Sequence, residues 1–124
     1  MASMNPARPA VLIVEDEVLL RMDAADLVEE AGFAAIEAAD ADEAVAILEA
    51  RPDIALLFTD VNMPGDMNGI DLAEHLKRLN PELHLIITSA LPVLRPVNQL
   101  PALFVAKPYH ADEVGSAASR LLAA

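Results

Sequence analysis

The chain has 124 residues, of which 20 are acidic and 8 are basic, and its formal net charge is −12. This length fits one compact domain. The acidic excess disfavours direct binding to nucleic acids or to anionic membrane surfaces, which both attract basic faces. Cysteine is absent, so disulfides and thiolate metal sites are excluded.

The N-terminal residues differ in character from the rest. Residues 1–9 contain two prolines and no hydrophobic segment of the secretory type, and we expect them to form a disordered leader. Residues 10–124 are expected to form the folded domain. No apolar run approaches the roughly 20 residues that cross a bilayer, so we expect no membrane insertion and a cytoplasmic location.

The first half of the folded region alternates short apolar runs with amphipathic segments. Residues 11–14 are wholly apolar, as in a strand covered on both faces, and residues 33–38 form a weaker second strand. A helix is predicted over residues 17–31, with Gly32 as its stop signal. Its inward face is expected to carry Leu20, Ala24, Leu27, Val28 and Ala31.

The middle of the chain contains the strongest predicted strand. A helix capped by Asp40 or Asp42 is expected to end near Ala50. The apolar run 54–59 follows it and reads as a buried strand. Residues 62–68 are rich in Pro, Gly, Asn and Asp and are predicted to form a loop.

The remaining elements continue the alternation of helix and strand. A helix is predicted over residues 70–79, a strand over 83–87, a strand over 103–106 and a last helix over 112–122. Residues 91–101 hold three prolines, which leave room for only a short or irregular helix. The apolar stripe of the 70–79 helix is expected to contain Leu72, Ala73, Leu76 and Leu79.

Strands that alternate with helices over short connections indicate an α/β fold with a parallel sheet and helices on both faces. We expect a doubly wound sheet of five strands, with a short or irregular fourth helix.

Polar side chains follow four of the predicted strands. The carboxyl ends of parallel strands share one edge of the sheet, so these side chains should meet there. Carboxylates gathered in this way repel one another unless a hard cation such as Mg²⁺ lies among them. The groups are Glu15 and Asp16 after the first strand, Asp60 after the third, Thr88 after the fourth and Lys107 after the fifth.

This set of groups suits phosphoryl transfer. A carboxylate such as Asp60 can act as a nucleophile and form an acyl phosphate. The transferred oxygens then need neutralisation, which a cation, Lys107 and the Thr88 hydroxyl can provide. Asn62, two residues beyond Asp60, can add a backbone carbonyl to the metal site.

The chain resembles the response-regulator receiver domains, the CheY-like family of two-component signalling. The resemblance covers about residues 10–122 and implies a flavodoxin-like sheet with the strand order 2-1-3-4-5. No single motif in it is specific, but their order and their positions at strand ends are. The motifs are Glu15-Asp16, Asp60-Val61-Asn62-Met63-Pro64-Gly65, Gly69, Thr88-Ser89-Ala90 and Lys107-Pro108-Tyr109.

The resemblance implies a role for each group. Asp60 would be the phospho-acceptor, and Mg²⁺ would be held by Glu15, Asp16, Asp60 and the backbone carbonyl of Asn62. Lys107 would bind the phosphoryl group, and the bond before Pro108 would be cis. Thr88 would be the switch hydroxyl and Phe104 the switch aromatic.

The resemblance also implies partners. A histidine kinase or a histidine phosphotransfer protein would donate the phosphoryl group, and slow self-hydrolysis would remove it. The output would be contact with an unknown protein target. No catalysis on other substrates is expected, and the protein would act as a stand-alone receiver domain.

Two segments depart from the common family pattern. The loop 63–69 is one residue longer than usual, with Asp66 as the extra residue near the acceptor. The segment 88–107 is shorter and carries the three prolines. We therefore expect the fourth helix not to form the usual output surface.

Two alternatives remain open. An aspartyl-phosphate-forming hydrolase of similar α/β fold would use the same nucleophile, although such hydrolases usually carry a second Asp where this chain has Asn62. A degenerate receiver would act only as a binding module, although the intact set of Asp60, Thr88 and Lys107 argues against it.

Overall fold

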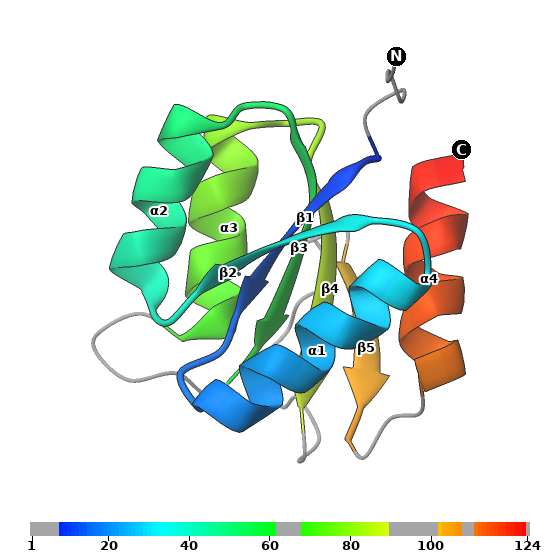
Figure 1. The fold of residues 1–124 in the computed structure, drawn as a ribbon. Coiled ribbons are helices and arrows are strands. Elements are labelled where there is room, and N and C mark those ends of the chain that lie inside the picture. The colour runs from blue at the N-terminus through cyan, green and yellow to red at the C-terminus, as the bar shows by residue number, and fades with distance from the viewer. Residues whose placement is uncertain (1–7, 62–67, 90–101, 108–110, 124) are drawn as a thin grey trace.

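The computed structural model describes residues 8–61, 68–89, 102–107 and 111–123. These residues form a parallel sheet with helices on both faces (Figure 1). The strands are β1 (Ala10–Val14), β2 (Ala34–Ala38), β3 (Ile54–Asp60), β4 (His84–Ser89) and β5 (Ala102–Ala106). The helices are α1 (Val18–Glu30), α2 (Ala41–Ala50), α3 (Gly69–Leu79) and α4 (Ala111–Ala123).

The strand order is β2-β1-β3-β4-β5, which confirms the predicted flavodoxin-like topology. Helices α2 and α3 cover one face of the sheet, and α1 and α4 cover the other (Figure 1). This arrangement places every strand's carboxyl end at one edge. The short or irregular fourth helix predicted within residues 91–101 lies outside the described residues, so α4 is the helix predicted as the last.

The central strands are apolar because both of their faces are covered. All five residues of β1 are buried, and alternate side chains enter different layers, as the two-residue period of a strand requires. Leu12 packs in the layer under α2 and α3, whereas Val11 and Ile13 pack in the layer under α1 and α4. The continuous apolar run 11–14 therefore reflects two cores rather than one.

The end of α1 and the start of α2 were both predicted correctly from the local sequence. Gly32 follows α1 with φ of 99°, a left-handed conformation that glycine adopts without steric cost. Asp40 caps α2, because its carboxylate accepts a hydrogen bond from the Glu43 N–H at 2.9 Å.

Two apolar residues predicted to face the core are exposed instead. Leu20 is 41% exposed and Leu79 is 46% exposed. Leu20 lies one turn before Ala24, the first buried residue of α1, and Leu79 lies at the end of α3 beyond the buried Leu76. The periodicity identified the correct face of each helix, but it could not show where the neighbouring elements stop.

No helix among the described residues is long and apolar enough to cross a bilayer.

Candidate functional site: an acidic and lysine-containing edge of the sheet

The predicted polar groups lie at the carboxyl edge of the sheet and on one of its faces. Ile13, Phe58 and Ile86 pack on the α1 and α4 face. Side chains alternate along a strand, so the residues two positions further on project to that same face. These residues are Glu15, Asp60 and Thr88. Lys107 lies two residues beyond Val105, which packs on this face as well.

Asp60 and Lys107 form an ion pair that bridges β3 and the end of β5. The Lys107 Nζ donates a hydrogen bond to Asp60 Oδ2 at 2.5 Å. Both side chains are mostly buried, with exposed fractions of 11% for Asp60 and 24% for Lys107. A charge-assisted bond in such a setting is stronger than one between neutral groups. It therefore fixes the two predicted reactive groups against each other.

Backbone hydrogen bonds hold both ends of this pair. The Lys107 N–H donates to the Ser89 carbonyl at 2.9 Å, and the Val61 N–H donates to the Thr88 carbonyl at 2.9 Å. Asp60 is the register partner of Thr88, which is 1% exposed. The strand between the acid and the lysine therefore sets their separation and places the threonine beside the acid.

The loop after β1 carries the two other acids. Glu15 is buried, whereas Asp16 is exposed. Burial raises the pKa of Glu15, and a hydrogen bond with the Asp16 carboxyl and the charge of Asp60 act in the same direction. The Glu17 N–H, which donates to the Glu15 carboxylate at 3.1 Å, and the Lys107 charge oppose this shift in the Glu15 pKa.

A hard cation fits this donor set. Among the described residues no three His, Cys, Asp or Glu side chains are arranged to hold a metal on their own. Mg²⁺ needs no such cage, since it keeps several waters and binds through one or two carboxylates. Glu15 interacts with both Asp16 and Asp60, so several carboxylate oxygens lie near one another and Lys107 supplies a single positive charge among them. Two predicted features, the Asn62 carbonyl and the cis bond at Pro108, lie outside the described residues.

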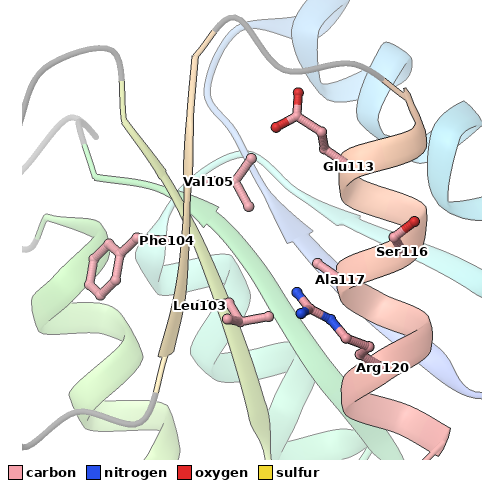
Figure 2. A pocket seen from close by; sticks show the side chains of 7 residues that line it. All are labelled: Leu103, Phe104, Val105, Glu113, Ser116, Ala117 and Arg120. Carbon is pink, nitrogen blue, oxygen red and sulfur yellow. The ribbon is translucent and has the colours of Figure 1, made fainter.

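Phe104 lies on the other face of β5 from the reactive groups. Figure 2 shows its ring projecting away from Leu103, Val105 and α4, and Phe104 is 38% exposed. A separate pocket of about 610 Å³ lies between β5 and α4. Its lining comprises Leu103, Phe104, Val105, Glu113, Ser116, Ala117 and Arg120 (Figure 2). Of the predicted site residues, the described lining includes Phe104 but none of Glu15, Asp16, Asp60 or Lys107.

The start of α3 lies directly against the backbone of Asp60. The Gly69 N–H donates to the Val61 carbonyl at 2.8 Å. A Cβ atom at Gly69 would lie 1.9 Å from the Asp60 carbonyl oxygen. Asn68 and Asp71 form a reciprocal capping box at this helix start. Sequence reasoning used Gly69 only as a family motif and missed its steric role, for which an isolated glycine opening a helix is the only signal.

Glu15→Gln is expected to stabilise the protein at neutral pH. Because the folded-state pKa of Glu15 is raised, Glu15 favours folding when protonated, and this benefit is lost as pH rises through that raised pKa. Glutamine carries no charge, so the free energy of unfolding should be higher for the variant than for wild type at neutral pH. Urea unfolding at neutral and acidic pH measures the difference between variant and wild type.

The gain should disappear near and below the ordinary glutamate pKa of 4.5, where Glu15 is protonated in the folded and unfolded states alike. Glu29→Gln, at an exposed position of α1, is the matched control for the change in net charge. Equal stability of Glu15→Gln and wild type at neutral pH would contradict a buried, destabilising charge at Glu15.

The topology and the edge site together define a signalling domain of the CheY-like type. Residues 11–118 match the response regulator receiver domain family, and the chain belongs to this family. It is 32% identical to the chemotaxis protein CheY of Thermotoga maritima over 117 residues, which cover 90% of this chain and 95% of that protein.

Other relatives are longer proteins or isolated receiver domains. The transcriptional regulatory protein PdtaR of Mycobacterium tuberculosis is 35% identical over 109 residues, covering 84% of this chain but only 52% of that protein. The receiver domain of the hybrid histidine kinase CckA is 29% identical, with a TM-score of 0.78 and coverage of 91% of this chain and 98% of that one. A receiver domain from Clostridium thermocellum has the same fold, with a TM-score of 0.85 at 22% identity and coverage of 93% and 94%.

Proposed function

We propose that the protein takes a phosphoryl group from a histidine kinase or a histidine phosphotransfer protein onto Asp60. It then signals through contact with another protein. The observation that carries this proposal is the Asp60–Lys107 ion pair at 2.5 Å beside the acidic pair Glu15 and Asp16. We assign the function to residues 10–124 and to the cytoplasm, where kinases form phosphohistidine from ATP.

The chemistry follows from the placement of these groups. A carboxylate oxygen of Asp60 attacks phosphorus, the phosphorus–nitrogen bond of the donor breaks, and the imidazole nitrogen keeps the electron pair and takes up a proton. The Lys107 ammonium neutralises a phosphoryl oxygen. We further propose that the Thr88 hydroxyl hydrogen-bonds another phosphoryl oxygen and that Phe104 changes its position in response, which makes this pair the switch.

The proposed metal site supports the same step. We assign Glu15, Asp16, Asp60 and the Asn62 carbonyl to a Mg²⁺ site. When bound, Mg²⁺ supplies charge neutralisation for the transferred oxygens. Burial is the main cause of the raised Glu15 pKa and the Asp60 charge adds to it, so a dication at this edge would favour the ionised form of Glu15.

A surface next to the site suits a protein donor. The first turns of α1 expose apolar side chains, with exposed fractions of 54% for Val18, 69% for Leu19 and 52% for Met22. These residues directly follow the acidic loop. A donor protein that covers them would bring its phosphohistidine to the edge where Asp60 lies, and burial of apolar area would stabilise the complex.

Asp16→Asn tests the proposed site. The variant keeps the shape of the side chain and removes one proposed metal ligand, so the Mg²⁺ concentration needed for half-maximal phosphorylation by acetyl phosphate should rise at least tenfold. Intact-mass analysis over a Mg²⁺ titration measures the phosphorylated fraction. Asp23→Asn, at an exposed position of α1, makes the same charge change outside the site and should behave as wild type.

The experiment separates the alternatives. A degenerate receiver would show no phosphorylation of wild type at any Mg²⁺ concentration. An aspartyl-phosphate hydrolase would turn over the phosphate donor repeatedly, whereas we expect a single, slowly hydrolysed phosphoryl group per molecule and no catalysis on other substrates.

A further inference from the structure

Arg21 links the acidic loop to a neighbouring strand. Its Nη1 donates a hydrogen bond to the Glu15 carbonyl oxygen at 2.9 Å, and its Nε donates to Glu37 Oε1 at 3.1 Å. Arg21 lies on α1 and Glu37 lies on β2. The Arg21 side chain is only 17% exposed, whereas Glu37 is 42% exposed. One guanidinium therefore bridges three elements: the loop, the helix and the edge strand.

The Glu15 peptide is held from both sides. The Glu15 N–H donates to the Ala38 carbonyl at 3.1 Å, and its carbonyl accepts from Arg21. Both bonds tie the loop to β2, directly through Ala38 and indirectly through Glu37. The peptide that follows this carbonyl belongs to Asp16, so the orientation of the Asp16 side chain depends on the same anchor.

The two-point contact requires the shape of arginine. The guanidinium is planar and presents several donors in a rigid fork, whereas the lysine ammonium is a point charge on a flexible stem. Lysine at this position could satisfy the carbonyl or the carboxylate, but it would not fix one against the other. The Arg21 charge is paired with Glu37, so its main effect on the loop is geometric.

We propose that Arg21, anchored by Glu37, is a positioning residue that holds the Glu15–Asp16 loop ready for Mg²⁺. This inference rests on the proposed function, because it concerns the metal site assigned there. Groups that orient metal ligands from outside the coordination shell commonly affect metal affinity by about 10 to 100-fold. The two Arg21 hydrogen bonds go to the Glu15 carbonyl and to Glu37, neither of which is a proposed ligand atom, so Arg21 acts through the loop backbone.

The test is a calorimetric titration of the full chain with Mg²⁺ alone. Arg21→Ala and Arg21→Lys should both lower the Mg²⁺ affinity by about tenfold or more. Since the lysine variant keeps the positive charge, its loss of affinity identifies geometry as the cause. A purely electrostatic role would leave Arg21→Lys at wild-type affinity and would overturn the proposal.

The matched control is Arg51→Ala. Arg51 forms a comparable ion pair with Asp53 at 2.7 Å, but between exposed side chains outside the acidic edge, and its loss should leave Mg²⁺ affinity unchanged. Glu37→Gln removes the anchor without altering Arg21 and should give a smaller loss of affinity. Glu37→Gln keeps the test decisive if the Arg21 variants do not fold, because wild-type affinity in this variant would refute the anchor.

Phosphorylation by acetyl phosphate provides a second measurement. A positioning role predicts that saturating Mg²⁺ restores the wild-type phosphorylation rate in Arg21→Lys, while the half-saturating Mg²⁺ concentration rises. If wild type itself does not bind Mg²⁺, the proposed metal site is wrong and the inference falls with it. If wild type binds and every Arg21 and Glu37 variant matches it, only the inference is refuted.

Discussion

Replacing Asp60 with asparagine is expected to reduce phosphorylation to background, with either acetyl phosphate or a cognate kinase as donor. The amide oxygen of asparagine is a far weaker nucleophile than a carboxylate, so no acyl phosphate can form. The substitution also removes the negative partner of the Lys107 ammonium at 2.5 Å.

The loss should be chemical rather than structural. Asparagine has nearly the same shape as aspartate, so the variant should unfold in a cooperative transition like wild type. Asp53→Asn is the matched control: Asp53 directly precedes β3, pairs with Arg51 and is largely exposed, and its loss should leave phosphorylation intact. Mass mapping of the phosphorylated residue completes the test, and a phosphoryl group that persists on another residue of the Asp60→Asn protein would show that the acceptor is misassigned.

Gly69→Ala is expected to destabilise the protein more than an alanine substitution at either of the other two glycines that the structure describes, Gly32 and Gly115. The added Cβ would lie 1.9 Å from the Asp60 carbonyl oxygen, 2.7 Å from the Asp60 carbonyl carbon and 3.0 Å from the Val61 Cα. All three atoms belong to the backbone, so no side chain can rotate out of the way. Either α3 moves and loses the Gly69 N–H bond to Val61, or the end of β3 moves and carries Asp60 with it.

We expect this variant to lose about 3 kcal/mol in the free energy of unfolding and to be phosphorylated much more slowly than wild type. Urea unfolding and acetyl phosphate labelling measure the two effects. Gly115→Ala is the matched control, because a Cβ there meets only the Ala31 Cβ at 3.4 Å and alanine favours a helix interior over glycine. If both variants were equally stable, the close approach at Gly69 would be refuted.

The sequence predicted the sheet well because four of the five strands contain a short apolar run that leads into polar residues, whereas β2 contains Glu37 and was the weakest prediction. The run 11–14 and the run 54–59 correspond to β1 and β3, and each ends at an acid. The strand order 2-1-3-4-5 followed from the resemblance to the receiver family, because strands joined by short parallel connections also fit other doubly wound orders. The convergence of Asp60 and Lys107, 47 residues apart, followed from the topology once the strands were assigned.

Features that depend on how elements pack could not be predicted in this way. The Arg21 link to Glu37 joins residues 16 apart through the packing of α1 on β2, and helical periodicity only places Arg21 away from the core. The steric role of Gly69 depends on how closely α3 approaches β3. The exposure of Leu20 and Leu79 depends on where neighbouring elements end, which an amphipathic pattern does not contain.

The exposed apolar turn of α1 has a consequence for how such pathways diversify. Val18, Leu19 and Met22 lie outside both buried layers, so exchanging them should cost little folding stability. Reactivity resides in the neighbouring strand ends and is untouched by such exchanges. In the proposed function, exchanging these three side chains would therefore change which donor protein binds without changing the groups that react with the phosphoryl group.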